Sequence, residues 1–176
     1  MPNLLIIDDN PAVATALDVL FSLHDISTLH AETPEAGLAM LQAESVDLVI
    51  QDMNFTADTT SGEEGIALAA IRAMHPDLPV ILLTAWTHLS SAVDLVKAGA
   101  ADYMAKPWDD RKLLATVNNL LELAEARSEL DLRRNRERHR QEQLANKYDL
   151  RGVIFDGPPS ERIIALACQV ARSDLP

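Results

Sequence analysis

Short apolar runs alternate along the first part of the chain with segments in which apolar residues recur at helical spacing. Runs of this kind, rich in Val, Ile and Leu, are typical of parallel strands covered by helices on both faces. The pattern predicts an α/β fold with a doubly wound, five-stranded parallel sheet of flavodoxin-like (βα)5 order, whose functional site lies beyond the carboxyl ends of the strands. The five runs are Leu4–Asp9, Ile26–Ala31, Val46–Met53, Val80–Ala85 and Ala101–Ala105.

Local signals mark where several helices begin and end. Asn10-Pro11 and Thr33-Pro34 each place a capping residue before a proline at the first helical position. The stretch from Asp109 to about Tyr148 contains neither Gly nor Pro, so it predicts one extended helix. We expect a turn over Asp156–Ser160 and then a further helix.

The later part of this long helix carries a broken heptad pattern. Apolar residues fall on one seam at Leu123, Leu130, Leu144 and Tyr148. Charged and amide side chains interrupt the seam at Arg127, Arg134, Glu137 and Gln141. The heptad pattern predicts a homodimer through this helix, although we expect the coiled coil to be weak by itself.

Charge divides the chain into two regions. The net charge is −12, and residues 1–110 hold 17 acidic but only three basic residues, whereas residues 111–150 hold nine basic and seven acidic ones. The acidic region is a poor ligand for nucleic acid, which needs clustered Lys and Arg, but it suits a divalent cation. The arginines of the long helix alternate with acidic residues, which favours a solvated face over a DNA-binding one.

Composition also limits the location and the chemistry. No apolar run approaches the ~18 residues that span a bilayer, and the start of the chain lacks a basic secretory segment, so we expect a cytoplasmic protein with no membrane partner. One cysteine cannot form an internal disulfide, and the five histidines lack the paired spacing of a zinc site.

Three carboxylates follow strands that are neighbours in a doubly wound sheet. Asp8 and Asp9 follow the first strand, and Asp52 follows the third. Crowded carboxylates repel one another unless a cation neutralises them, and Mg²⁺ prefers oxygen ligands. The sequence therefore predicts a magnesium site that Asp8 and Asp9 help to hold.

Thr84 and Lys106, at the ends of the fourth and fifth strands, complete this pocket. A lysine and a hydroxyl can each bind a phosphoryl oxygen. The set predicts phosphoryl transfer in which Asp52 is the nucleophile and Lys106 stabilises the developing charge.

These motifs resemble the receiver domains of bacterial two-component response regulators. The resemblance spans about residues 3–122 and rests on Ile6-Ile7-Asp8-Asp9-Asn10, Val49-Ile50-Gln51-Asp52-Met53-Asn54, Leu83-Thr84-Ala85 and Tyr103-Met104-Ala105-Lys106-Pro107. It implies phosphorylation of Asp52 by a sensor histidine kinase and dependence on Mg²⁺. It also implies that the carbonyl of Asn54 joins the metal ligands, that Lys106-Pro107 is a cis peptide, and that Thr84 and Tyr103 switch together.

One segment departs from the family pattern. The loop Phe55–Glu64 is several residues longer than receivers usually have between the acceptor and the next helix. Because this loop would lie over the site, the family's phosphoryl lifetime is not carried over to this chain.

The tail is similar to the entry into the AAA+ module of NtrC-type sigma-54-dependent transcription activators. The glycine loop that would bind nucleotide phosphates is absent. The resemblance implies a receiver over 1–122, a linker helix over 123–148 and the truncated start of the AAA+ module over 149–176. Contacts with sigma-54 RNA polymerase and DNA would then belong to parts missing from this chain.

Two alternatives remain from the sequence. A receiver can control another output, such as a nucleotide cyclase or an adaptor coil. A magnesium-dependent phosphohydrolase could instead use an aspartyl-phosphate intermediate, but such enzymes often carry a second acid where this chain has Asn54. We therefore expect that the protein is not an enzyme, and a turnover assay with phosphate esters discriminates the two classes.

Overall fold

The structure is a computed structural model that describes residues 1–53, 63–84, 96–97, 99–147 and 157–171. The chain divides into two units, Met1–Glu125 and Ala126–Pro176. The first unit holds the sheet and the candidate site.

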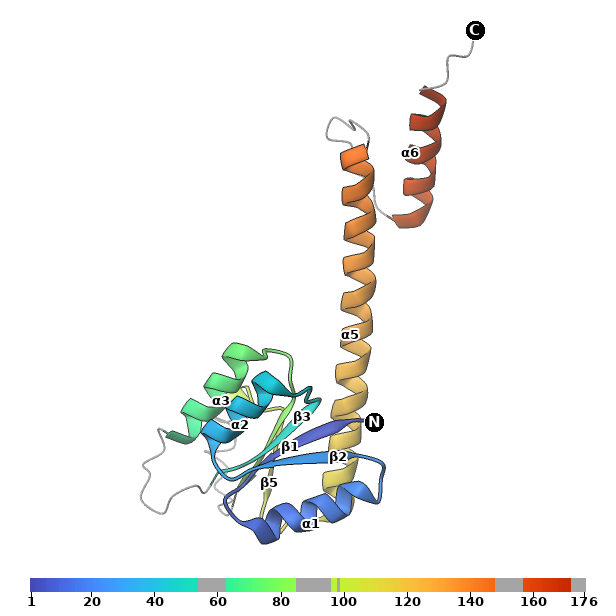
Figure 1. Ribbon diagram of the computed structural model, residues 1–176. Helices are drawn as coiled ribbons and strands as arrows, with labels where there is room; N and C mark the ends of the chain where they lie inside the picture. Colours follow the sequence, from blue (N-terminus) through green and yellow to red (C-terminus); the bar gives the residue numbers. More distant parts are fainter. Residues whose placement is uncertain (54–62, 85–95, 98, 148–156, 172–176) are drawn as a thin grey trace. The chain divides into compact units, whose positions relative to one another are not determined.

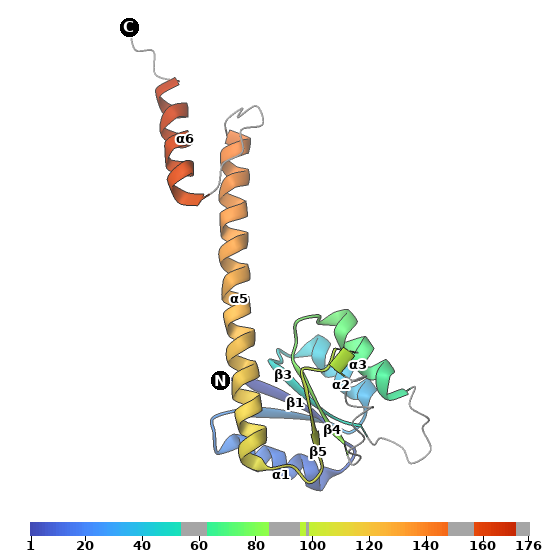
Figure 2. The same cartoon turned by 180° about the vertical axis from the view of Figure 1, so that it is seen from behind.

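Five parallel strands form one sheet in the order β2-β1-β3-β4-β5 (Figures 1 and 2). This is the doubly wound arrangement that the apolar runs predict. It makes β1 and β3 direct neighbours, so that the residues after both strands meet at one edge. The strands are β1 (Asn3–Ile7), β2 (Ser27–Ala31), β3 (Leu48–Asp52), β4 (Val80–Thr84) and β5 (Asp102–Ala105).

Helices cover both faces of the sheet because each strand alternates its side chains between them. On β1, Leu4 and Ile6 pack with α1 (Pro11–Ser22) and the start of α5 (Asp110–Lys147). The intervening residues of β1 pack with α2 (Pro34–Ala43) and α3 (Glu63–Met74) on the other face (Figure 1).

The predicted starts of α1 and α2 are confirmed. The Asn10 side chain accepts a hydrogen bond from the Ala12 backbone N–H at 3.0 Å, and the Thr33 hydroxyl accepts one from the Ala36 N–H at 3.2 Å. Each cap precedes a proline within the first helical turn. Since the β1–α1 turn carries the two acids, the Asn10 cap also fixes where the candidate site begins.

Arg72 of α3 ties this helix to the segments that lead into β4 and β5. Its Nε donates to the Gly99 carbonyl at 2.8 Å, and its Nη1 donates to the carbonyls of Pro76, at 3.1 Å, and Leu78. Gly99 has a φ of 105°, a left-handed conformation that favours glycine. These bonds anchor the loops from which the last two strands begin.

The second unit is helical where it is described. The long helix α5 begins in the first unit and continues into the second, running unbroken over Asp110–Lys147 as predicted. The second helix of this unit, α6, spans Gly157–Ala171. The turn expected over Asp156–Ser160 is wrong for its last four residues, which belong to α6. Prolines at 158 and 159 are compatible with the first helical turn because the N–H groups there have no helical partner. Among the described helices, none combines the length and apolarity needed to cross a bilayer.

Candidate functional site

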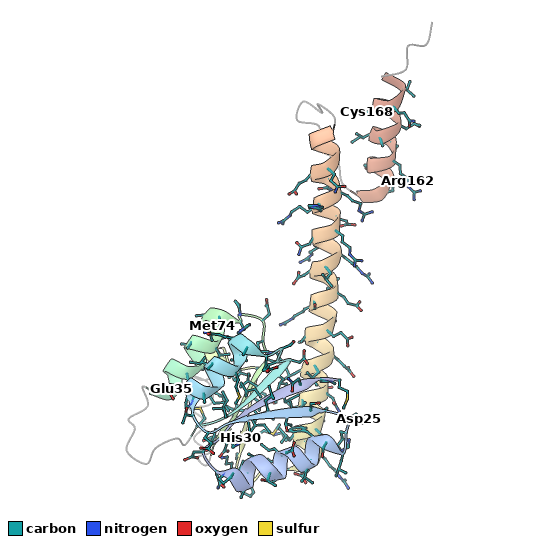
Figure 3. All side chains as sticks on the ribbon, viewed as in Figure 1. Asp25, His30, Glu35, Met74, Arg162 and Cys168 are labelled. Atoms are coloured by element: carbon teal, nitrogen blue, oxygen red, sulfur yellow. The ribbon has the colours of Figure 1, made fainter. Side chains whose placement is uncertain are left out.

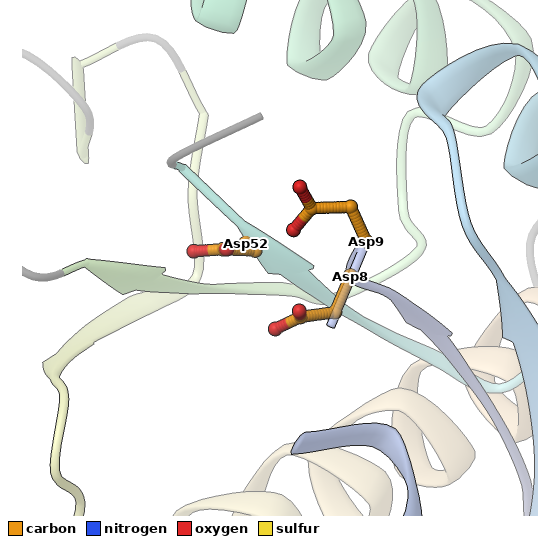
Figure 4. Close-up of side chains that lie close together, drawn as sticks. All are labelled: Asp8, Asp9 and Asp52. Atoms are coloured by element: carbon orange, nitrogen blue, oxygen red, sulfur yellow. The ribbon is translucent and has the colours of Figure 1, made fainter. Parts of the chain in front are cut away.

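The carboxyl ends of β1 and β3 bring three carboxylates together. In the sheet register Ile7 lies beside Gln51, so the residues that follow these two are neighbours. One carboxylate oxygen from each of Asp8, Asp9 and Asp52 lies within 4.8 Å of the others (Figure 4). Asp8 and Asp52 are buried, whereas Asp9 is exposed.

Lys106 reaches this cluster from the end of β5. Its Nζ lies 2.8 Å from Asp8 Oδ2 and 2.9 Å from Asp52 Oδ2. Burial by itself lowers the pKa of Lys106, but hydrogen bonds and charge attraction from the two carboxylates outweigh burial and raise that pKa. The lysine is therefore a fixed positive charge between the two buried acids at neutral pH.

Hydrogen bonds or ion pairs engage the carboxylate, the backbone N–H and the carbonyl of Asp8. Its Oδ1 accepts the Asn10 backbone N–H at 2.8 Å, and its own N–H donates to the Ala31 carbonyl at 3.1 Å. The Asp8 carbonyl lies 2.8 Å from Nε2 of His30, the penultimate residue of β2. Sequence reasoning missed His30, because a bond between residues 22 positions apart leaves no local signal.

Thr84 lies at the carboxyl end of β4, and Tyr103 lies within the neighbouring strand β5. Thr84 is the last residue of β4 and is partly buried, and its carbonyl accepts the Lys106 backbone N–H at 2.7 Å. Tyr103 on β5 is partly buried against the core beneath α2 and α3. The peptide bond between Lys106 and Pro107 is cis, the form that the resemblance implies.

The residues present fit a magnesium ion. Three carboxylates supply the hard oxygen ligands that Mg²⁺ prefers, and their oxygens converge closely enough to share one ion. One ammonium group cannot neutralise three carboxylates, so the cluster retains negative charge that attracts a divalent cation. The fourth predicted ligand, Asn54, lies outside the described residues, as does the loop over 55–62 that follows it.

A carboxylate beside an ammonium group and a candidate cation site is an arrangement that suits phosphoryl transfer. Catalysis of that reaction depends on positioning the phosphoryl group and neutralising its oxygens rather than on proton transfer. Asp52 presents a carboxylate oxygen at this edge of the sheet, and the ammonium group of Lys106 lies within hydrogen-bonding distance of it. The charges and oxygens of this site are therefore compatible with phosphoryl-transfer chemistry.

Comparison with known proteins agrees with this geometry. The family model for the response regulator receiver domain matches residues 4–118. The response regulator protein FleR of Pseudomonas aeruginosa is 32% identical over 172 residues, covering 98% of this chain and 31% of FleR. The transcriptional regulatory protein GlrR of Escherichia coli is 32% identical over 120 residues, covering 68% of this chain and 26% of GlrR.

A solved structure extends the agreement to the fold. The response regulator receiver domain protein from Clostridium thermocellum has a TM-score of 0.63 and 27% identity, covering 72% of this chain and 98% of that one. The chain spans less than a third of the length of FleR and GlrR, so the matches concern one region of those proteins. By family match, fold and site residues, the chain belongs to the response regulator receiver family.

Proposed function

We propose that this receiver accepts a phosphoryl group on Asp52 from a sensor histidine kinase in a magnesium-dependent reaction. The observation that carries the proposal is the ammonium group of Lys106, 2.8 Å and 2.9 Å from carboxylate oxygens of Asp8 and Asp52. This contact joins the ends of three strands at one point. A lysine with only a surface role would not lie between two buried acids.

The chemistry follows from the residues of the site. An oxygen of Asp52 forms a bond to phosphorus while the bond from phosphorus to the kinase histidine nitrogen breaks, and that nitrogen keeps the electron pair. Lys106 binds an oxygen of the transferred group, and the hydroxyl of Thr84 donates to another. Asp8, Asp9 and Asp52, together with the Asn54 carbonyl, would hold Mg²⁺, which supplies positive charge to the phosphoryl oxygens when bound.

Phosphorylation would act as a switch by adding charge and acceptor oxygens at Asp52. New bonds from Thr84 and Lys106 would then favour one of two arrangements of the face that includes Tyr103. Couplings of this kind are typically ~1–3 kcal/mol, enough to shift a balanced equilibrium strongly.

We propose a sigma-54-dependent transcription activator as the output. The similarity of the tail to such proteins supports this output, as does the alignment with FleR over almost the whole chain. Residues 1–122 would form the receiver, 123–148 the linker helix and 149–176 the start of the AAA+ module. Contact with sigma-54 RNA polymerase and DNA would be made by parts outside this chain. We place the protein in the cytoplasm.

The linker helix is proposed to form a homodimer together with the receiver. Leu123 and Leu130 lie on the predicted heptad seam, and each is at least half exposed. A second copy of α5 would cover these leucines and thereby favour a coiled coil.

The acceptor role is tested by treating the protein with acetyl phosphate and Mg²⁺ and measuring intact mass. We expect the wild-type chain to gain one phosphoryl group and Asp52→Asn to gain none, because an amide is a poor nucleophile. Asp25→Asn is the matched control, since Asp25 precedes β2 at the opposite edge of the sheet. Equal phosphorylation of wild type and Asp52→Asn would remove Asp52 from its role.

A further inference from the structure

His30 makes a contact with the candidate metal site that its place on β2 would not suggest. Figure 3 labels this residue among the strands of the sheet. It lies beside Ile6 of β1 in the sheet register, yet its Nε2 lies 2.8 Å from the carbonyl oxygen of Asp8, two residues further along. The residue is partly buried, so the bond is partly shielded from water.

The direction of this hydrogen bond is fixed by chemistry. A backbone carbonyl has no hydrogen to donate, so Nε2 of His30 must carry the proton and act as the donor. The bond therefore requires a side chain with an N–H at this position. A ring of the same shape without nitrogen would leave the partly shielded carbonyl of Asp8 without this partner.

The bond acts on the peptide that joins the two acids of the β1–α1 turn. The Asp8 carbonyl, the Asp9 N–H and the Asp9 Cα lie in one rigid plane, so a bond that orients the carbonyl also orients the start of Asp9. The Asp9 side chain is exposed, and within the described part of the chain no hydrogen bond holds its carboxylate. Its direction toward Asp8 and Asp52 thus depends on the backbone.

We propose that His30 is a positioning residue for the metal site, acting through the Asp8 carbonyl to direct the Asp9 carboxylate toward the ion. The inference rests on the proposed function, because it assigns His30 a role in the same magnesium site. The other polar contacts of Asp8 hold its own carboxylate and N–H. The bond from His30 is the one made to the Asp8 carbonyl, which belongs to the following peptide.

The test compares His30→Phe with His30→Gln. Phenylalanine keeps the ring and removes the donor, whereas the glutamine side-chain nitrogen is as many bonds from Cα as Nε2 of histidine and can donate in its place. Thr28→Val is the matched control, because Thr28 donates to Asp18 of α1 from the same strand, two residues before His30. It removes a β2 hydrogen bond that does not involve the site.

Two measurements are made on the full chain. Calorimetric titration with MgCl₂ is expected to show about tenfold weaker binding for His30→Phe, recovery with His30→Gln and no change with Thr28→Val. In the metal-free protein, the carbonyl ¹³C resonance of Asp8 should move in His30→Phe but not in Thr28→Val.

Different results separate this inference from the proposed function. If the wild-type chain binds Mg²⁺ and His30→Phe binds it equally well, the positioning role is refuted and the magnesium site stands. If Thr28→Val weakens binding as much as His30→Phe, the effect belongs to β2 as a whole, and the inference fails. If the wild-type chain binds no Mg²⁺, both the inference and the magnesium dependence are refuted.

Discussion

At the scale of single residues, Lys106 places one positive charge between two buried carboxyl groups. The exposed fractions of the Asp8 and Asp52 side chains are 1% and 5%, and each has an oxygen within 2.9 Å of Nζ. Removing one partner from such a group leaves uncompensated charge, which is costly in a shielded site. We expect Lys106→Met to lower the free energy of unfolding by about 3 kcal/mol at neutral pH without divalent cation, as measured by urea denaturation.

The same residue predicts a pH dependence. Because the two carboxylates raise the pKa of Lys106 in the folded protein, its proton stabilises the fold fully below the unfolded pKa of about 10.4. That stabilisation is lost as pH rises through the higher folded value. The stability of the wild type should therefore approach that of Lys106→Met in strongly alkaline solution. A difference between the two proteins that stays constant from neutral to alkaline pH would contradict this assignment.

His30 shows where residue-level prediction from sequence ends. The convergence of Asp8, Asp52 and Lys106 follows from strand order alone, since parallel strands end at one edge, and the structure brings these residues together as that order requires. The bond from His30 depends on the register of β2 against β1 and on the path of the following turn. Neither the strand register nor the path of the turn can be predicted from a short stretch of residues.

At the scale of elements, α2 crosses β1 at a glycine. A Cβ added to Gly37 would lie 2.5 Å from Cδ1 and 2.9 Å from Cγ1 of Ile7, whose side chain is fully buried. Alanine favours a helix over glycine by about 1 kcal/mol, but overpacking a core costs about 1–3 kcal/mol. We expect Gly37→Ala to destabilise the protein by about 1 kcal/mol in urea denaturation, because the rigid, branched Ile7 cannot move aside.

Ile7→Val provides the control, since valine lacks the Cδ1 atom that lies nearest to the added Cβ. In a double-mutant cycle, Gly37→Ala should cost less in the Ile7→Val background than in the wild type. Equal costs in both backgrounds would show that the methyl group added at Gly37 does not clash with Cδ1 of Ile7. Since Ile7 directly precedes Asp8, this contact also fixes the strand that carries the acids.

Element boundaries were predictable where the signal is local. The caps at Asn10 and Thr33 were found because a capping side chain and the proline after it are adjacent in sequence. The predicted start of α6 is wrong because Asp156-Gly157-Pro158-Pro159 has the composition of a turn. The same prolines are equally compatible with the first turn of a helix, and local composition does not distinguish the two.

At the scale of the whole molecule, the proposed homodimer depends on which leucines of α5 a second copy covers. Leu130 and Leu132 have almost equal exposed fractions, 53% and 54%, but Leu130 alone lies on the heptad seam. We expect Leu130→Glu to raise the dimer dissociation constant about tenfold in sedimentation equilibrium, because a buried charge disfavours the coiled coil.

Leu132→Glu is the matched control for this experiment. It introduces the same charge at the same exposure and helix propensity, but on the face of α5 that points away from the seam. Its dissociation constant should equal that of the wild type. If both variants weaken the dimer equally, the contact between copies is not the predicted seam. If the wild-type chain is monomeric at every concentration, with or without acetyl phosphate, α5 does not form a dimer. A selective effect of Leu130→Glu would leave the heptad pattern as the physical basis of assembly, since exposure and charge are matched in the two variants.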